Sequence, residues 1–467
     1  MPQYYSRRDF LRTLGKGAGS LAAMQMLRPS CLMADTPNNP NGTIKYLILL
    51  VMDGGYDGHT IFPFTDDRQD IMALRRPTIG IPKANVLGLN GAALGLNPAL
   101  TGLHAIHGAG NLKLLGGVGT AGASASHEDA KQYYSDGGKS LTPSIRYGHI
   151  ARLANTYSLN VNQVWGLLSS NTRPDFRLPN GYAGLQVNGK ISGFTYQNRD
   201  SDLGGSTAEG TFSRSIVTSV RGLNGAQSPL EERFAQAIDR LETNVPVIQA
   251  VAARVPGTGY PDYNNGSDPD FAAISNNKRV IDAFIDADRV ITDRVASSDT
   301  TPVIIQISWG GFDDHADLTV RLGQKMRTLD RLLAPFRAHM TELGVWDKTA
   351  IYGYSEFNRT LSENGALNSE GAGTGGGTDH SQSNIHFLVG GRVAGGNTAV
   401  VGSLPSLEFI DMRRVNRTPS QSAWINNGMP YSIDYRDVLS QLVQAMGFDT
   451  APIYPENFPH QNLQLFT

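Results

Sequence analysis

The sequence predicts an α/β fold built around a mostly parallel sheet, and two observations lead to this prediction. Several short apolar runs end at glycine or polar residues, as strands buried on both faces do. A long amphipathic pattern separates two of these runs, and strand, helix and strand in this order form a parallel βαβ unit. The 467 residues suffice for one large domain with insertions or for two domains.

Five runs carry the strand signal and two later stretches carry the helix signal. The strands are expected at residues 46–52, 112–119, 301–308, 349–355 and 385–391. Between the third and fourth, apolar residues recur every three or four positions from Leu318 to Leu343, and Gly344 is a typical stop signal. A second amphipathic helix near the C-terminus has Asp434 near its start and Gly447 at its end.

Residues 161–295 have a different character from the rest of the chain. Polar, Gly- and Asn-rich stretches are followed by two helical patterns, "PLEERFAQAIDRLE" and "NKRVIDAFIDADRVITDRV". We interpret this region as an insertion or cap on the sheet, within a single domain of residues 35–467.

The first 34 residues are interpreted as a targeting segment. Arg7 and Arg8 precede a weakly apolar stretch that is too short and too polar to span a membrane, which matches a twin-arginine export signal cleaved after Ala34. The alternative is a tail with a chance Arg-Arg pair. Export predicts a periplasmic or extracellular protein, with the twin-arginine machinery as a partner. The only cysteine, Cys31, lies in this segment, so the mature chain has no thiol for a disulfide or a metal.

The charge balance excludes one class of partner. Forty basic and forty-two acidic residues give a formal net charge of −2, without a run of like charge. A nucleic-acid-binding chain typically carries a basic surplus, so we expect no nucleic-acid partner.

Acidic and imidazole side chains flank each predicted strand. In open parallel sheets, functional residues gather beyond the carboxyl ends of strands. The candidate metal ligands are Asp53, Asp57, His127, Asp313, His315, Glu356, Asp379 and His380. Such a set suits one or two divalent ions, namely zinc, manganese, calcium or magnesium. Two ions can hold both the attacking and the leaving oxygen of a phosphoryl-type displacement.

Two further residues are candidates for catalysis. For each of them, a purely structural role stays open beside the catalytic one. Ser126 lies at the start of a predicted helix, where a metal-activated hydroxyl can be a nucleophile, but Ser126 and Asp129 also form a capping box. Arg359 is a catalytic candidate, yet Glu356 and Arg359 could be an ion pair in a surface turn. Likewise Asp313 to His315 could simply begin a helix, and Asp379 and His380 could be the tip of a loop.

The same motifs resemble a known family. In order along the chain they are "SRRDFL", "GGYDG", "SHEDA", "GFDDHAD", "SEFNRT", "GTDHS" and "VGGRVAGG". They resemble the bacterial exported family catalogued as domain of unknown function 1501, through nearly all of the mature chain. That family is thought to be distantly related to the alkaline phosphatase and sulfatase superfamily. The relation implies a three-layer α/β/α sandwich, a metal site at the carboxyl edge of the sheet, and hydrolysis of phosphate or sulfate esters.

Carried over by position, the resemblance assigns roles to several residues. The first-strand Asp-Gly motif falls on Asp53 or Asp57, the nucleophile on Ser126, and an Asp and His pair on Asp313 and His315. The next Asp-His pair falls on Glu356 and Phe357, and the last histidine on His380. Phe357 cannot bind a metal, so a two-metal site loses a ligand unless His127 or Asp379 replaces it. Asn358 and Ser381 stand where the nearer family usually has glycine.

The two carboxylates after the first strand receive opposite rankings. Asp53 is closer to the end of the apolar run, which favours it as a ligand. The family pattern Gly-Gly-x-Asp-Gly instead falls on Asp57, and we expect Asp57 to take the metal or catalytic role, with Asp53 as the backup. Gly54 and Gly55 would let the chain turn tightly between them.

Three functions follow from these observations. The leading hypothesis is an exported metal-dependent hydrolase that acts on a phosphate or sulfate ester of a small molecule or polymer. The alternative is a non-catalytic binding or assembly module of the same fold at the cell surface, which Phe357 favours. The third is an exported oxidoreductase, but the chain has no G-x-G-x-x-G motif after the first strand and no cysteine for clusters.

Overall fold

The computed structural model of the protein describes most of the chain between residues 42 and 467. The described residues are 42–121, 125–138, 148–168, 174–178, 181–188, 190–193, 244–263, 268, 270, 275–366, 374–396, 399–405, 407, 428–454 and 458–467. The predicted export signal in residues 1–34 lies outside them, as does the first helical pattern of the predicted insertion.

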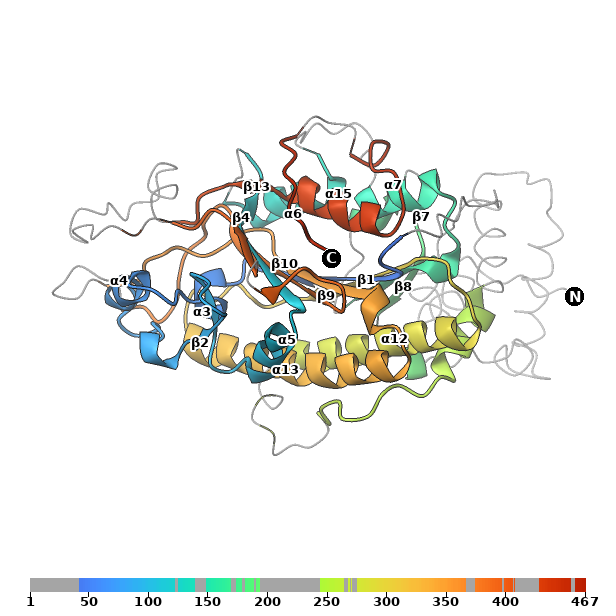
Figure 1. The fold of residues 1–467 in the computed structure, drawn as a ribbon, viewed down its shortest axis with the longest axis horizontal. Helices are drawn as coiled ribbons and strands as arrows, with labels where there is room; N and C mark the ends of the chain where they lie inside the picture. Colours follow the sequence, from blue (N-terminus) through green and yellow to red (C-terminus); the bar gives the residue numbers. More distant parts are fainter. Residues whose placement is uncertain are drawn as a thin grey trace, which may run out of the picture.

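A nine-stranded sheet forms the centre of the molecule (Figure 1). Its order is β12-β4-β11-β10-β1-β9-β5-β8, with β13 beside β4. Within it, β11 runs antiparallel to both of its neighbours, and every other pairing is parallel. The strands are β1 (Tyr46–Met52), β4 (Leu112–Gly119), β5 (Val164–Leu168), β8 (Leu185–Asn188), β9 (Val303–Trp309), β10 (Thr349–Tyr354), β11 (Asn384–Gly390), β12 (Val400–Gly402) and β13 (Ile433–Asp434). All five predicted strands are present.

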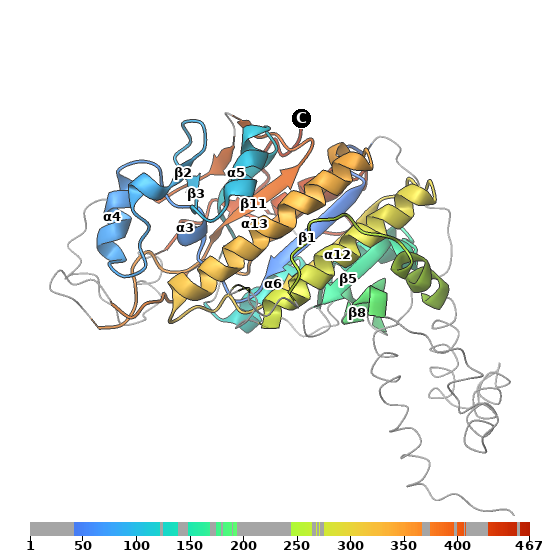
Figure 2. The same cartoon turned by 90° about the horizontal axis from the view of Figure 1, so that it is seen from below.

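Helices cover both faces of the sheet, which confirms the predicted three-layer α/β/α architecture (Figures 1 and 2). One layer holds α5 (Thr101–Gly108), α12 (Ser275–Ala296) and α13 (Leu318–Glu342). The other holds α6 (His127–Asp136), α7 (His149–Thr156) and α15 (Tyr435–Ala445). Side chains of β1 alternate between the layers: Ile48 and Leu50 belong to one hydrophobic core, and Leu47 and Leu49 to the other. The continuous apolar run therefore reflects burial on both faces.

The two predicted helices end and begin as their sequences indicate. Gly344 follows the last turn of α13 with a φ of +69°, a conformation that glycine adopts without strain. At the start of α15, the Asp434 carboxylate accepts a hydrogen bond from the Arg436 amide at 3.0 Å. The remaining elements are short: α3 (Gly58–Ile61), α4 (Arg68–Arg75), η1 (Lys83–Asn85), η2 (Val161–Gln163), η3 (Pro174–Phe176), η4 (Ile191–Gly193), η5 (Trp346–Lys348), and the strand pairs β2 (Leu87–Gly88) with β3 (Gly95–Leu96) and β6 (Arg177–Leu178) with β7 (Gly181–Tyr182).

Part of the region predicted as an insertion belongs to the core of the domain. Both β5 and β8 extend the central sheet beyond β9, and α12 packs beside α13 on one face. The sequence did not place these strands, because short strands such as "VWGLL" give too weak a periodic signal. The cap or insertion at residues 161–295 stays a prediction for the rest of the region.

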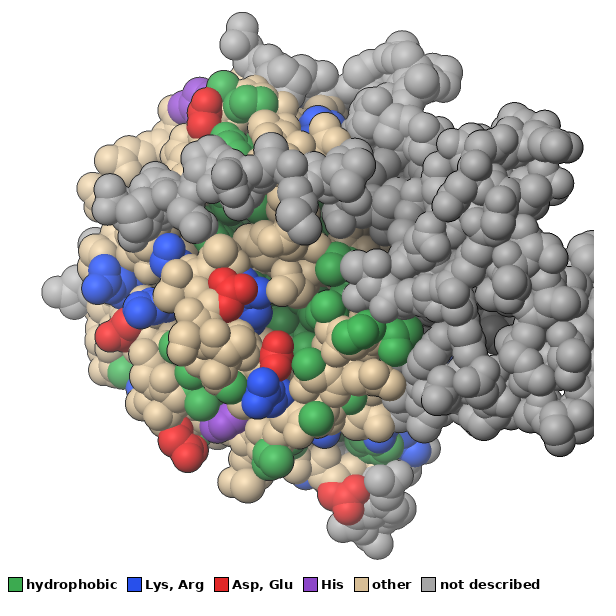
Figure 3. All heavy atoms as spheres, turned by 90° about the vertical axis from the view of Figure 1, so that its right-hand side faces the viewer, with side chains coloured by type: hydrophobic (Ala, Val, Ile, Leu, Met, Phe, Trp, Pro, Cys, Tyr) green, Lys and Arg blue, Asp and Glu red, His purple; other side chains and the backbone are tan. Residues whose placement is uncertain are grey.

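The surface of the described residues carries a mixed charge. On the face in Figure 3, acidic, basic and apolar side chains are interspersed. In the described part of the chain, no helix combines the length and the apolar character that crossing a membrane requires.

Candidate metal and active site

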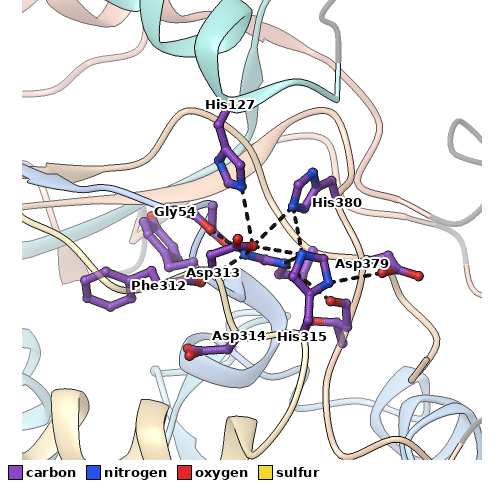
Figure 4. Close-up of polar contacts among 12 residues, drawn as sticks. Gly54, His127, Phe312, Asp313, Asp314, His315, Asp379 and His380 are labelled. Carbon is purple, nitrogen blue, oxygen red and sulfur yellow. Dashed lines mark hydrogen bonds and ion pairs between the residues drawn. The ribbon is translucent and has the colours of Figure 1, made fainter. Parts of the chain in front are cut away.

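Three imidazoles surround one carboxylate oxygen at the carboxyl edge of the sheet (Figure 4). The oxygen is Oδ1 of Asp313, in the loop between β9 and α13. Its distances to the Nε2 atoms are 2.9 Å for His315, 3.2 Å for His380 and 3.4 Å for His127. His127 begins α6, and His380 lies in the loop before β11. The fold thus brings together residues from three separate strand ends.

Each imidazole is oriented by a hydrogen bond on its other nitrogen. The Nδ1 atoms donate to Glu356 Oε1 for His127 (2.8 Å), to Asp379 Oδ1 for His315 (3.2 Å) and to the Ala125 carbonyl for His380 (2.8 Å). These partners are acceptors, and each takes the proton in the tautomer that is protonated on Nδ1. Burial also lowers the pKa of His380, which favours its neutral ring. In that tautomer the three Nε2 atoms turn lone pairs towards Asp313, whereas in the other tautomer they donate to its carboxylate.

This arrangement fits a divalent metal ion. Lone pairs that converge on a carboxylate oxygen repel one another unless a cation lies among them. His127, Asp313 and His380 offer ligand atoms that all lie within 4.8 Å of one another. Tetrahedral zinc with bonds of about 2.0–2.1 Å separates its ligand atoms by roughly 3.3–3.4 Å, close to the distances around Asp313 Oδ1. Hydrogen bonds on Nδ1 are also the usual support of histidine ligands.

Arg359 lies against the same carboxylate and is fully buried. Its Nη2 donates to Asp313 Oδ1, and its Nε donates to the Gly55 carbonyl at 2.6 Å. Partial burial by itself raises the pKa of the Asp313 carboxyl, but the hydrogen bond and charge of Arg359 outweigh it and hold that pKa well below its usual range. Asp313 thus stays ionised, and Arg359 is not exposed to a substrate, as a catalytic contact would be.

Glu356, predicted as a metal ligand, contacts one of the three imidazoles. Its carboxylate is buried and accepts hydrogen bonds from the Gly54 amide at 3.0 Å, the Ser355 hydroxyl at 2.7 Å and His127 Nδ1. Burial raises the pKa of Glu356, but the His127 hydrogen bond, the Lys131 charge and further hydrogen bonds lower it more, so the pKa lies below its usual value. Its charge fixes the orientation of His127.

Phe357 forms an aromatic floor beneath the cluster. Its ring centroid lies 4.7 Å from those of His127 and His380, and the side chain is fully buried. The same ring leaves no room for a side chain at Gly55, where an added Cβ would lie 2.3 Å from it. Gly55 also has a φ of +65°, so the turn after β1 needs glycine for both reasons.

Asp57, the carboxylate ranked first after the first strand, has structural contacts. Its Oδ1 accepts from the amides of His59 (3.1 Å) and Thr60 (3.0 Å), which caps α3, and its Oδ2 pairs with Arg76 at 2.7 Å. Both Asp57 and Arg76 are buried. Because the cap and the ion pair engage both oxygens, these contacts do not support the predicted metal role.

The remaining candidates lie around the cluster in different ways. Asp53 joins two strand ends through its backbone: its amide donates to the Trp309 carbonyl at 2.9 Å, and its carbonyl accepts from the Phe312 amide at 3.1 Å. Asp379 is exposed and holds His315. Ser126 is exposed at the N-cap of α6, between Ala125 and His127, and accepts from the Asp129 amide at 3.5 Å.

Sequence reasoning missed two residues near the cluster. Lys131 lies one turn after His127 on α6, and its ammonium is 3.8 Å from Glu356. The spacing of four residues on one helix was a signal that could have found it. Lys325 is buried and pairs with Asp314 at 3.2 Å, which draws Asp314 away from the imidazoles (Figure 4). No periodic pattern distinguishes a buried lysine from an exposed one.

A family model described as "Protein of unknown function (DUF1501)" matches residues 268–416. This match confirms the predicted family resemblance over these residues, and its extension through the rest of the mature chain stays a prediction. The DUF1501 segment, defined by these residues, contains the motifs with Asp313, Glu356 and His380, and His127 lies outside it. No curated protein matches the sequence significantly.

The fold is similar to several solved structures at very low identity. They include the PsFucS1 sulfatase from Pseudoalteromonas sp. (10% identity, 85% of this chain and 68% of that chain, TM-score 0.33). Another is alkaline phosphatase from the Antarctic bacterium TAB5 (12%, 75% and 91%, TM-score 0.31). A third is the lipoteichoic acid synthase LtaP from Listeria monocytogenes (10%, 80% and 71%, TM-score 0.30). Likeness at this level carries no information on activity.

Proposed function

We propose that this protein is a metal-dependent hydrolase of phosphate or sulfate esters. The observation that carries the proposal is the convergence of three imidazole Nε2 atoms on the ionised Asp313 carboxylate. His127, Asp313 and His380 would hold the ion, with His315 beside them. A bound divalent ion polarises an ester oxygen and lowers the pKa of a nearby hydroxyl.

The residues around the cluster suit an anionic ester. Ser126 is exposed at the N-terminus of α6, where the helix dipole favours negative charge. Its hydroxyl is the candidate nucleophile, because the adjacent His127 belongs to the cluster. Lys131, whose side chain is 31% exposed, places a positive charge on the same helix. A substrate anion would therefore meet the helix N-terminus and a cation together.

Export belongs to the same proposal. The Arg7-Arg8 segment supports passage through the twin-arginine pathway, which carries folded proteins, so the ion could be bound before export. The protein would then act in the periplasm or outside the cell, on an ester of a small molecule or of a polymer.

The test combines metal content with turnover. The purified full chain should contain a divalent ion in near-stoichiometric amount and hydrolyse 4-nitrophenyl phosphate or 4-nitrophenyl sulfate. Ser126→Asn is the decisive variant, since asparagine keeps the N-cap but has no hydroxyl nucleophile. Loss of turnover with retained metal and stability supports the proposal. Metal-free protein of full stability contradicts it.

A non-catalytic binding module is the second candidate, and Phe357 favours it. An aromatic floor occupies the position where the superfamily resemblance implies a metal ligand, and it leaves fewer ligands for chemistry. This function predicts bound metal, no turnover of either ester, and an unchanged protein after Ser126→Asn. Turnover that depends on Ser126 excludes it.

A further inference from the structure

Arg359 is locked in place by four backbone carbonyls. In addition to the Gly55 carbonyl, its guanidinium donates to the carbonyls of Gly54, Phe312 (3.1 Å) and Thr378 (3.3 Å). These carbonyls come from the turn after β1, the loop after β9 and the loop before β11. The side chain of Arg359 is 0% exposed, and each nitrogen of its guanidinium donates a hydrogen bond. The guanidinium therefore cannot rotate towards solvent.

The locked guanidinium also touches the centre of the imidazole cluster. Its Nη2 donates to Asp313 Oδ1, the oxygen that the three imidazoles face. Its Nη1 lies 3.4 Å from His315 Nε2, an atom that bears a lone pair when Nδ1 is protonated. A permanent positive charge thus stands beside the ligands, where its charge and that of a second ion would compete for the same carboxylate.

Three described carboxylates at this edge of the sheet already have partners of their own. Glu356 is surrounded by hydrogen-bond donors, Asp57 is paired with Arg76, and Asp314 is paired with Lys325. Phe357 offers no ligand atom, and its ring closes the floor below His127 and His380. The three imidazole Nε2 atoms converge on one position, at Asp313 Oδ1.

We propose that the centre binds a single divalent ion and that the Arg359 guanidinium takes the place of a second one. The inference rests on the proposed function only in requiring an ion at the imidazole cluster. It assigns Arg359 a positioning and charge-compensating role in place of contact with substrate. The active form would then carry one exchangeable ion and one cation built into the fold.

The same geometry predicts what happens when the guanidinium is removed. Arg359→Ala would leave a space lined by four carbonyl oxygens and one carboxylate. Such oxygen ligands suit Mn²⁺ or Ca²⁺. We therefore expect the variant to bind a second ion, more weakly than the first. Free guanidinium added to the variant should displace that second ion.

The experiment counts Mn²⁺ ions on the full chain. Chelator-treated protein is titrated with Mn²⁺ and measured by native mass spectrometry and by electron paramagnetic resonance. The expected result is one ion per chain with the spectrum of an isolated Mn²⁺, and a second ion in Arg359→Ala. Arg321→Ala, which removes an exposed arginine beside Asp314, is the matched control and should bind one ion.

The outcomes separate this inference from the proposed function. Two coupled Mn²⁺ ions in the unmodified chain overturn the single-ion centre and leave a metal-dependent hydrolase standing. One ion without ester turnover supports the single-ion centre and contradicts the hydrolase. No ion overturns both. A folded Arg359→Ala variant that still binds one ion overturns the proposal that the guanidinium takes the place of a second ion. If that variant does not fold, the number of Mn²⁺ ions bound by the unmodified chain decides.

Discussion

The turn after β1 and the loop after β9 each carry an aspartate paired with a buried arginine, yet the two carboxylates differ in what they can do. Asp57 is buried with Arg76, and capping bonds engage its other oxygen. Asp313 pairs with Arg359, but its side chain is 46% exposed and three imidazoles reach the same oxygen. The ion pair is closed off from solvent in the first region, and in the second it leaves the carboxylate within reach of other groups.

This difference teaches that sequence position at a strand end does not decide the role of a carboxylate. Both residues follow strands at the same edge of the sheet. Neighbouring groups decide the role, because hydrogen-bond donors on a buried carboxylate compete with a metal ion for its lone pairs. The predictions below test this contrast between the two regions.

Asp57→Ala should give the largest effect, on stability. It leaves Arg76 buried without its partner, and breaking a buried pair in this way costs about 3–5 kcal/mol of unfolding free energy. Chemical denaturation measures the loss, and calorimetric titration should show unchanged ion affinity in the folded protein. Asp66→Ala is the control, because the Asp66–Arg68 pair is partly exposed and should be worth less than about 1 kcal/mol. Intact stability with lost ion binding would make Asp57 a ligand after all.

Asp313→Asn should give the reverse pattern. Removing the central charge should weaken ion binding by more than the roughly 10–100-fold seen when a residue that only orients a ligand is changed. The unfolding free energy should fall less than in Asp57→Ala, since Asp313 is half exposed. Asp314→Asn is the neighbouring control and should reduce stability more than ion affinity, because Asp314 pairs with the buried Lys325. Equal ion affinity in Asp313→Asn and the unmodified chain contradicts the proposed centre.

The two carboxylates that orient imidazoles should contribute differently to ion affinity. In Glu356→Gln, a neutral amide replaces the carboxylate that faces the Gly54 amide and His127 Nδ1. We expect about a 10–100-fold loss of ion affinity. Asp379→Asn changes an exposed partner of His315 and should cost roughly 10-fold or less. Titration calorimetry compares them directly. An equal loss in both variants would mean that burial does not set the strength of this support.

His59, one turn into the region that Asp57 caps, should make stability depend on pH. Burial, helped by the charge of Arg76, lowers the pKa of His59 from 6.5 to about 3, and neither ring nitrogen has a hydrogen-bond partner among the described residues. Between these values the unfolded chain binds the proton and the folded chain does not, so stability falls as the pH drops below 6.5. At pH 5.5 the loss is about 1.4 kcal/mol relative to pH 8.

His59→Phe should remove that part of the pH dependence without changing ion binding. Phenylalanine suits the site because His59 already stacks on Phe64, with ring centroids 5.9 Å apart. Unfolding curves of both proteins from pH 8 to pH 5 measure the difference. Parallel stability profiles would show that the His59 ring is protonated in the fold without cost.

The sequence by itself determined the five strands at the centre of the sheet and the types of residue at its edge. Continuous apolar runs and a 3.6-residue period are local signals, so β1, β9, β10 and α13 could be placed before any contact was known. Parallel strands end at one edge, which is why Asp313, His315 and His380 could be expected near His127. The family resemblance rests on the same motifs, in the same order along the chain.

Only the tertiary structure decided which of these side chains are free to bind. The amide of Gly54 reaches Glu356 across 302 positions, and Arg359 reaches Asp313 across 46. Charge compensation acts through such contacts and depends on distance and burial, which a single sequence does not encode locally. The same holds for β11, which reverses direction, and for β5 and β8, which extend the sheet, because strand neighbours are chosen by packing of the whole chain.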